Sequence, residues 1–223
     1  MATPYLQLRV EEVPSTQDRA LAELGTLPVV VIAQRQTAGR GRSGASWLSA
    51  PRALAVSLAF RPGESDHRPF SLMAGVAAAR AVDLTLKWPN DLMRGDEKLG
   101  GILVEQGDEV VVGMGLNLWW PDPPPGAAAL HVQDPGADLH AEIAGLWAAE
   151  MMALVDGEGW PENEYRARCS TLGREITWDP EGRGTALDIA ESGALIVKTR
   201  DEVTELFSGE IRHLRTVDPR LGP

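Results

Sequence analysis

The chain has 223 residues, of which 43% are hydrophobic and 24% are charged, and these values are typical of a folded globular protein. Its net charge of -11 argues against general binding to nucleic acid, because that binding requires lysine and arginine to displace counterions from the polyanion. The sequence starts without a signal-peptide pattern and contains no apolar run of about 18 residues, so we expect a cytoplasmic protein without membrane contact.

Short apolar or alternating runs predict the strands of a first sheet. In Ala53–Phe60 both sets of alternate residues are apolar or small, which indicates that both faces of this strand are covered. The link Gln106–Glu109 contains Gly-Asp and predicts a hairpin, so a purely parallel sheet is excluded. The predicted strands are Tyr5–Val10, Val29–Gln34, Ala53–Phe60, Thr85–Trp88, Gly101–Gln106 and Glu109–Leu116.

Longer periodic runs predict helices between these strands. Ser15 is expected to cap the first helix, with Asp18 completing a capping box and Gly25 ending it. The third helix has apolar residues at helical spacing and is therefore expected to pack on the core. The predicted helices are Thr16–Leu24, Phe70–Val82, Ala137–Val155 and Glu164–Leu172.

From Arg174 onward, the short strand patterns EITWD, GTALDIA, ALIVKT and VTELFSG are separated by glycine-containing turns. This texture predicts a small β-barrel of about 45 residues docked on the first domain. We therefore expect an α+β protein. Residues 1–173 would carry a mixed, partly antiparallel sheet with helices packed on it, and residues 174–223 would form the barrel.

One segment is rich in arginine and lacks acids. No Asp or Glu occurs between Leu24 and Gly63, and within this span lies Gly39–Trp47, with the sequence GRGRSGASW. Glycines permit close backbone approach, guanidinium groups donate forked hydrogen bonds, and an indole can stack on a purine ring. We predict a flexible loop that binds an anion, the alternative being ordinary solvated arginines. The segment is neither a Walker loop nor a dinucleotide fingerprint.

Three further segments are dense in glycine and functional groups. Lys87–Asp91 (KWPND) follows a predicted strand, although a turn with a solvated lysine is the alternative interpretation. Lys98–Glu105 (KLGGILVE) places a lysine just before an apolar run, where it is either a site residue or a strand-edge gatekeeper. Gly113–Asn117 (GMGLN) adds glycines for close approach and one amide side chain.

In this order, the segments resemble those of biotin protein ligases, and the resemblance extends from Ser15-Thr16-Gln17 to the closing SGALIV and SGEI of the barrel. It implies a class II synthetase-like core followed by an SH3-like barrel. It also implies that biotin is activated by ATP with magnesium to biotinyl-5'-AMP and then transferred to a lysine of a biotin carboxyl carrier protein. A monomer or homodimer without a permanently bound cofactor is expected.

The same resemblance assigns roles to individual residues. The residues assigned to biotin and its adenylate are Ser15, Thr16, Gln17, Gln36, Arg40, Gly41, Arg42 and Lys98. The residues placed nearer the nucleotide are Trp47, Asn90 and Asn117. The catalytic set is Lys98, Arg42, Lys87 and Asp91, in which Asp91 either acts on the carrier lysine or positions phosphate-bound magnesium. No metal held by the protein itself is expected.

Two positions depart from the pattern of the family. Ala45 stands where a second arginine is often found, and Gln17 stands where asparagine is frequent. About fourteen residues precede Ser15, so a winged-helix domain and repressor activity are not expected.

The alternatives are a lipoate or octanoate ligase or transferase of the same superfamily, and a non-catalytic module that binds biotin or an adenylate. A transferase would need a cysteine nucleophile, but the single cysteine, Cys169, is expected to be buried in the fourth helix. The histidines lack the spacing of metal ligands and are interpreted as solvated or packing residues; they are His67, His131, His140 and His213.

Overall fold

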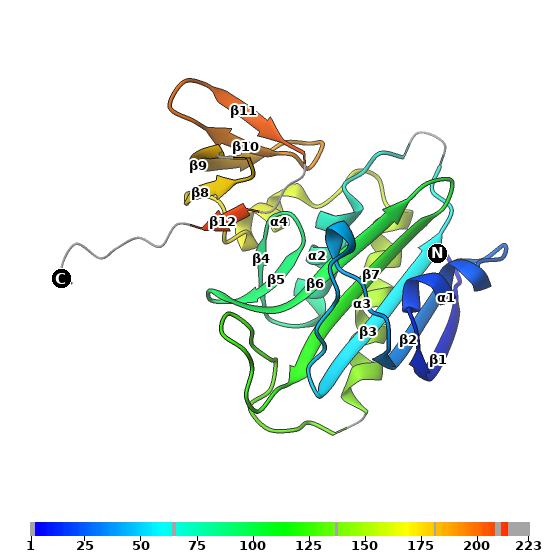
Figure 1. Cartoon of the computed structure of the whole chain (residues 1–223). Coiled ribbons are helices and arrows are strands. Elements are labelled where there is room, and N and C mark those ends of the chain that lie inside the picture. The colour runs from blue at the N-terminus through cyan, green and yellow to red at the C-terminus, as the bar shows by residue number, and fades with distance from the viewer. Residues whose placement is uncertain (1–2, 64–65, 137, 181, 208–210, 214–223) are drawn as a thin grey trace.

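The computed structural model describes residues 3–63, 66–136, 138–180, 182–207 and 211–213, and a seven-stranded mixed sheet forms its centre (Figure 1). The strand order is β1-β2-β3-β7-β6-β5-β4. β1 and β2 are parallel because α1 connects them, and every other neighbouring pair is antiparallel. The strands are β1 Leu6–Val13, β2 Val29–Gln36, β3 Arg52–Phe60, β4 Thr85–Lys87, β5 Asp91–Arg94, β6 Glu97–Gln106 and β7 Val110–Trp119.

Helices lie on both faces of this sheet (Figure 1). α2 (Phe70–Ala81) and α3 (Leu139–Asp156) pack on one face, where alternate residues of β3 such as Leu54 and Phe60 enter the main core. α1 (Thr16–Glu23) covers part of the other face, and its Ala20 packs in a smaller cluster with Ala59 of β3. The prediction that both faces of β3 are covered is thus confirmed.

The ends of the helices differ from the prediction in identifiable ways. The Ser15 cap is confirmed, since its Oγ accepts from Asp18 N at 3.3 Å, but the Asp18 carboxylate binds Arg40 instead of completing a capping box. α4 spans Glu162–Arg168 and ends before Leu172, because Cys169 is extended and forms a bridge to β4. The predicted start of the third helix at Ala137 lies outside the described residues.

A second, five-stranded antiparallel sheet has the order β11-β10-β9-β8-β12, in agreement with the predicted small barrel. Its strands are β8 Glu175–Trp178, β9 Gly182–Ile189, β10 Leu195–Lys198, β11 Val203–Leu206 and β12 Ile211–His213. Apolar residues such as Ile176 and Val197 join the main core, and Trp88 Nε1 donates to Gly193 O at 3.0 Å.

Two predictions about this part of the chain are not resolved by the structure. The predicted strand 203–209 ends at Leu206, and the Ser208 and Gly209 of its closing motif lie outside the described residues. The division of the chain at residue 174 stays a prediction. Of the helices in the described ranges, none has the length and apolar character needed to cross a membrane.

Candidate functional site

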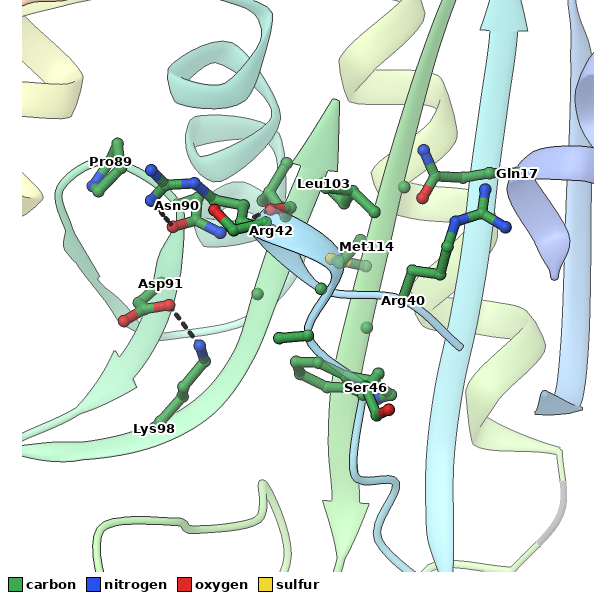
Figure 2. A pocket seen from close by; sticks show the side chains of 18 of the residues that line it. Gln17, Arg40, Arg42, Ser46, Pro89, Asn90, Asp91, Lys98, Leu103 and Met114 are labelled. Atoms are coloured by element: carbon green, nitrogen blue, oxygen red, sulfur yellow. Dashed lines mark hydrogen bonds and ion pairs between the residues drawn. The ribbon is translucent and has the colours of Figure 1, made fainter. Parts of the chain in front are cut away.

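A cavity of about 690 Å³ opens on the same face of the large sheet as α1. Ser57 of β3, Gly113 and Gly115 of β7, and Gly101 of β6 form its floor. These residues share one face because side chains alternate along a strand. The glycines place no side chain above the backbone, so other groups can approach it closely. α1, the loop 39–47 and the turn 87–91 form its walls (Figure 2).

Two side chains from the walls pack directly on this glycine floor. A Cβ atom at Gly115 would lie 2.9 Å from Cε2 and Cζ2 of Trp47, and one at Gly113 would lie 3.2 Å from Cγ and Cδ of Gln17. The first of these distances is too short for any real side chain, so only glycine admits the indole at this position. The prediction that GMGLN supplies close approach is confirmed, and the groups that approach are Trp47 and Gln17.

The wall near α1 carries a hydrogen-bonded network of buried polar groups. Thr16 donates to Gln36 Oε1 from its backbone N at 2.7 Å and from Oγ1 at 2.9 Å. Thr16 Oγ1 also lies 2.7 Å from Ser57 Oγ. Because the single hydroxyl hydrogen of Thr16 goes to Gln36, Ser57 must donate to Thr16. The Oε1 atom of the Gln36 amide therefore accepts both hydrogen bonds from Thr16, and its Nε2 group remains available as a donor.

Gln17 has the opposite polarity. Its Nε2 donates to Glu105 Oε2 at 3.1 Å, and an ionised carboxylate can only accept. Gln17 Oε1 is therefore left as an acceptor. The wall thus combines an amide donor from Gln36 with an amide acceptor from Gln17, and this combination suits a ligand that carries C=O and N–H groups.

The loop 39–47 folds as a tight hairpin over the cavity. Gly41 N donates to Ala45 O at 2.6 Å, and Trp47 N donates to Gly39 O at 3.0 Å. Ser43 has φ 54° and Gly44 has φ 76°, which reverses the chain direction at the tip. Arg40 and Arg42 flank Gly41, and their side chains point to opposite sides of the cavity (Figure 2).

Arg40 forms ion pairs with two carboxylates. Its Nη1 and Nη2 bind the two oxygens of Asp18 at 2.8 and 2.7 Å, and Nη2 lies 3.2 Å from Glu105 Oε1. The guanidinium hydrogen bonds hold the pKa of Asp18 below its usual value. The segment between Leu24 and Gly63 contains no Asp or Glu, yet Arg40 has acidic partners, which come from α1 and β6.

On the opposite side, Arg42 Nη1 donates to Asn90 Oδ1 at 3.1 Å, and Asn90 Nδ2 donates to Ile102 O at 2.8 Å. Asn90 therefore links the loop to β6. The KWPND segment forms the predicted turn between β4 and β5, and its Lys87, Asn90 and Asp91 line the cavity.

Lys98 and Asp91 form an ion pair with 2.5 Å between Nζ and Oδ1 (Figure 2). Lys98 Nζ also lies 5.9 Å from the centroid of the Trp47 ring. β6 has β7 on one side and β5 on the other, so the interpretation of Lys98 as a strand-edge gatekeeper is wrong. Its ammonium group belongs to the cavity.

With one exception, the structure brings the predicted site residues together in the lining of this cavity. The exception is Asn117, which is buried on β7 and donates from Nδ2 to Ala128 O at 3.1 Å. The lining contains Ser15, Thr16, Gln17, Gln36, Arg40, Gly41, Arg42, Trp47, Lys87, Asn90, Asp91 and Lys98.

Sequence reasoning missed several groups of the site. Ser57 carried a weak signal, as a polar residue among the alanines on one face of β3. The sequence indicates Asp18 only as a capping residue and Glu105 only as the last residue of the KLGGILVE segment. Ile211 and Arg212 of β12 also line the cavity, and they carried no local signal, because only the docking of the second sheet places them there.

The segment between α4 and the second sheet also holds the turn 87–91. Thr171 Oγ1 accepts from Trp88 N at 3.1 Å and lies 3.2 Å from Nε2 of His213 on β12. Burial, followed by the positive charges of Lys87 and Arg174, lowers the pKa of His213 to about 4. His213 is therefore neutral at pH 7 and serves in packing. It adds no charge beside the turn, where the charged side chains are those of Lys87 and Asp91.

Candidate metal ligands and the single cysteine can be placed in the part of the chain that the structure describes. There, no group of three or more His, Cys, Asp and Glu side chains is arranged to hold a metal ion. Cys169 is buried outside the cavity lining, and burial raises the pKa of its thiol.

The chain is similar to known proteins in both sequence and fold. The sequence model of the Biotin/lipoate A/B protein ligase family matches residues 11–119. The biotin--[acetyl-CoA-carboxylase] ligase of Mycobacterium tuberculosis is 32% identical over 211 residues, covering 84% of this chain and 79% of that protein. The biotin--[acetyl-CoA-carboxylase] ligase of Paracoccus denitrificans is 33% identical over 203 residues, covering 75% and 83%.

The fold is also similar to that of a solved structure, the biotin protein ligase from Aquifex aeolicus in complex with biotin and ATP. The TM-score is 0.79 at 25% sequence identity, and the match covers 95% of this chain and 99% of that one. This coverage includes both the large sheet and the small second sheet.

Replacing Gly115 by Ala places a methyl group 2.9 Å from the Trp47 indole, so we expect the indole and the loop to move away from β7. Trypsin cleavage after Arg40 and Arg42, identified by mass spectrometry, should become about fivefold faster as the loop opens more often. Gly107→Ala is the matched control, because its Cβ would have no neighbour within 4 Å. Equal cleavage rates in Gly115→Ala and the unchanged protein would contradict the anchoring of the loop by Trp47.

Proposed function

The chain belongs to the biotin protein ligase family, and we propose that its cavity binds biotin and ATP, forms biotinyl-5'-AMP, and passes the biotinyl group to a lysine of a biotin carrier protein. The observation that supports this assignment is that the two ends of the cavity differ in chemistry. Gln36 and Gln17 offer an amide donor and an amide acceptor at one end. Arg42 and Lys98 place cations on the other side of the cavity from Gln17 (Figure 2).

Biotin has two groups that match these ends. Its cyclic urea presents one C=O and two N–H groups, which pair with the Gln36 donor and the Gln17 acceptor. Its carboxylate then extends toward Arg42 and Lys98. A lipoyl or octanoyl group has no urea, so binding it would leave Gln36 Nε2 and Gln17 Oε1 covered without a partner, and such unpaired polar groups weaken binding. The amide pair therefore favours biotin over the lipoate and octanoate alternatives.

The first step must bring two anions together. A carboxylate oxygen of biotin attacks the α-phosphorus of ATP, a P–O bond breaks, and pyrophosphate leaves. Arg42 and Lys98 reduce the repulsion and orient the carboxylate, so that the enzyme contributes positioning and charge without a covalent intermediate on a side chain. Magnesium, which enters with ATP as part of the substrate, neutralises phosphate charge.

The second step joins the activated biotin to the carrier. The lysine amine attacks the carbonyl carbon of the mixed anhydride, AMP leaves, and the amine loses its proton. Asp91 is the carboxylate that lines the cavity, and we assign it the acceptance of this proton. Before substrates bind, Asp91 pairs with Lys98 and keeps that ammonium group inside the cavity. We assign Trp47 and Lys87 to the nucleotide side of the cavity.

A direct test is to incubate the protein with ATP, magnesium and one of biotin, lipoate or octanoate. Pyrophosphate release and mass spectrometry of the acyl-adenylate then report which acid is activated. We expect release with biotin, and transfer to a purified carrier domain when one is added. Activation of lipoate or octanoate in preference to biotin would overturn the assignment.

Lys98→Ala should slow adenylate formation about 100-fold, because it removes a fixed cation from the place where negative charge concentrates. The expected readout is a lower single-turnover rate of pyrophosphate release with an unchanged unfolding midpoint. Lys198→Ala, which removes an exposed lysine on β10, is the matched control. An unchanged rate of adenylation in Lys98→Ala would remove Lys98 from the mechanism.

Asp91→Asn keeps the shape of the side chain but removes its charge. If Asp91 accepts the proton of the carrier lysine, transfer from synthetic biotinyl-adenylate should slow more than adenylate formation does, and single-turnover measurements separate the two steps. If Asp91 instead positions phosphate-bound magnesium, both steps should fall together. Unchanged transfer from the preformed adenylate at every pH would exclude the base role.

A further inference from the structure

Glu105 connects two parts of the cavity wall, although it does not itself line the cavity. It lies on β6 on the same face as Gly101 and Leu103, and its strand partner is Val111. One carboxylate accepts from Gln17 Nε2 at 3.1 Å and from Arg40 Nη2 at 3.2 and 3.3 Å. Glu105 thus contacts both a side chain of α1 and the loop over the cavity.

We propose that Glu105 is a positioning residue that determines specificity for biotin, because it fixes the orientation of the Gln17 amide. This inference rests on the proposed function and extends it to a residue that does not touch the substrate. Its consequence is that Gln17 presents Oε1, and not Nε2, to the N–H group of a ligand.

The polarity follows from the chemistry of the carboxylate. An amide side chain can rotate by half a turn and exchange its oxygen and nitrogen with little change in shape. With Glu105 in place, the rotated form would set Gln17 Oε1 against a carboxylate oxygen, and two acceptors repel. Gln17 is only 6% exposed, so water offers little compensation for the rotated form. The carboxylate therefore selects one of two otherwise similar orientations.

The same carboxylate helps to hold the loop. Arg40 is paired with both Asp18 and Glu105, so these three groups together carry one negative charge. Arg40 is thereby occupied in holding the loop against α1 and β6, and the anionic end of the ligand is left to Arg42 and Lys98. Asp18 contributes the bidentate contact to Arg40, but it makes no contact with the Gln17 amide that could set its orientation. The two carboxylates therefore have separable effects.

The experiment compares Glu105→Gln with Asp18→Asn and with Glu109→Gln, the last being a control on the β6–β7 hairpin that pairs with Arg61. Gln at position 105 can donate as well as accept, so it no longer selects the orientation of Gln17. We expect Glu105→Gln to raise the KM for biotin about fivefold, the size of one lost hydrogen bond, while kcat and the KM for ATP change little.

Asp18→Asn should instead speed trypsin cleavage after Arg40 in the ligand-free protein, because it removes the bidentate contact that holds the loop. Glu109→Gln should alter neither the KM for biotin nor this cleavage. Thermal unfolding of each variant reports whether the fold is intact. A KM for biotin in Glu105→Gln equal to that of the unchanged protein, or a rise matched by Glu109→Gln, overturns the inference.

A double-mutant cycle with Gln17→Ala tests the route of the effect. If Glu105 acts through Gln17, adding Glu105→Gln to Gln17→Ala should cause no further rise in the KM for biotin. A further rise of the same factor in that background overturns the inference. Failure of the unchanged protein to release pyrophosphate with biotin would overturn the proposed function and this inference together. Normal activity of the unchanged protein, with no effect of Glu105→Gln, would overturn this inference alone.

Discussion

The site depends on one constraint, which is that three positions on neighbouring strands carry no side chain. Gly101, Gly113 and Gly115 share the face of the large sheet that α1 only partly covers, and any larger residue at Gly115 would collide with Trp47. Glycine weakens a strand because it gives up side-chain packing. Next to the glycines of β7, Met114 and Leu116 bury their side chains in the main core on the opposite face, which offsets part of that loss.

Charge is arranged around this floor in an order that suits two anionic substrates. The carboxylates of Asp18 and Glu105 are gathered at the α1 side and are balanced in part by Arg40. At the other side Arg42, Lys87 and Lys98 face the cavity, with Asp91 as the acid that pairs with Lys98. A protein with a net charge of -11 can therefore receive a carboxylate and a nucleoside triphosphate, because the local field in the cavity differs from the overall charge.

The sequence predicted most of the elements and the membership of the site, because both leave local patterns. Periodicity located β2, β3 and β7, and the glycine-rich segments located the cavity walls. The β5 strand, Asp91–Arg94, was missed because four residues beside a turn show little alternation.

The Arg40 pairs were missed because Asp18 is 22 and Glu105 is 65 residues away along the chain. The burial of Asn117 could not be predicted, because a motif does not show that a loop such as the one at Ala128 covers a side chain.

The departure at position 17 has a physical consequence that involves both Gly113 and Glu105. Gln17 crosses from α1 over Gly113, where its Cγ and Cδ lie 3.2 Å from the place of a Cβ atom, and its Nε2 then reaches Glu105. An asparagine is one methylene shorter, so its amide would end nearer α1, and its hydrogen bond to Glu105 would be longer than 3.1 Å. The longer side chain needs a residue without a side chain beneath it and an acceptor at its end. Gly113 and Glu105 meet these two requirements on adjacent strands, so the position of the Gln17 amide depends on both strands.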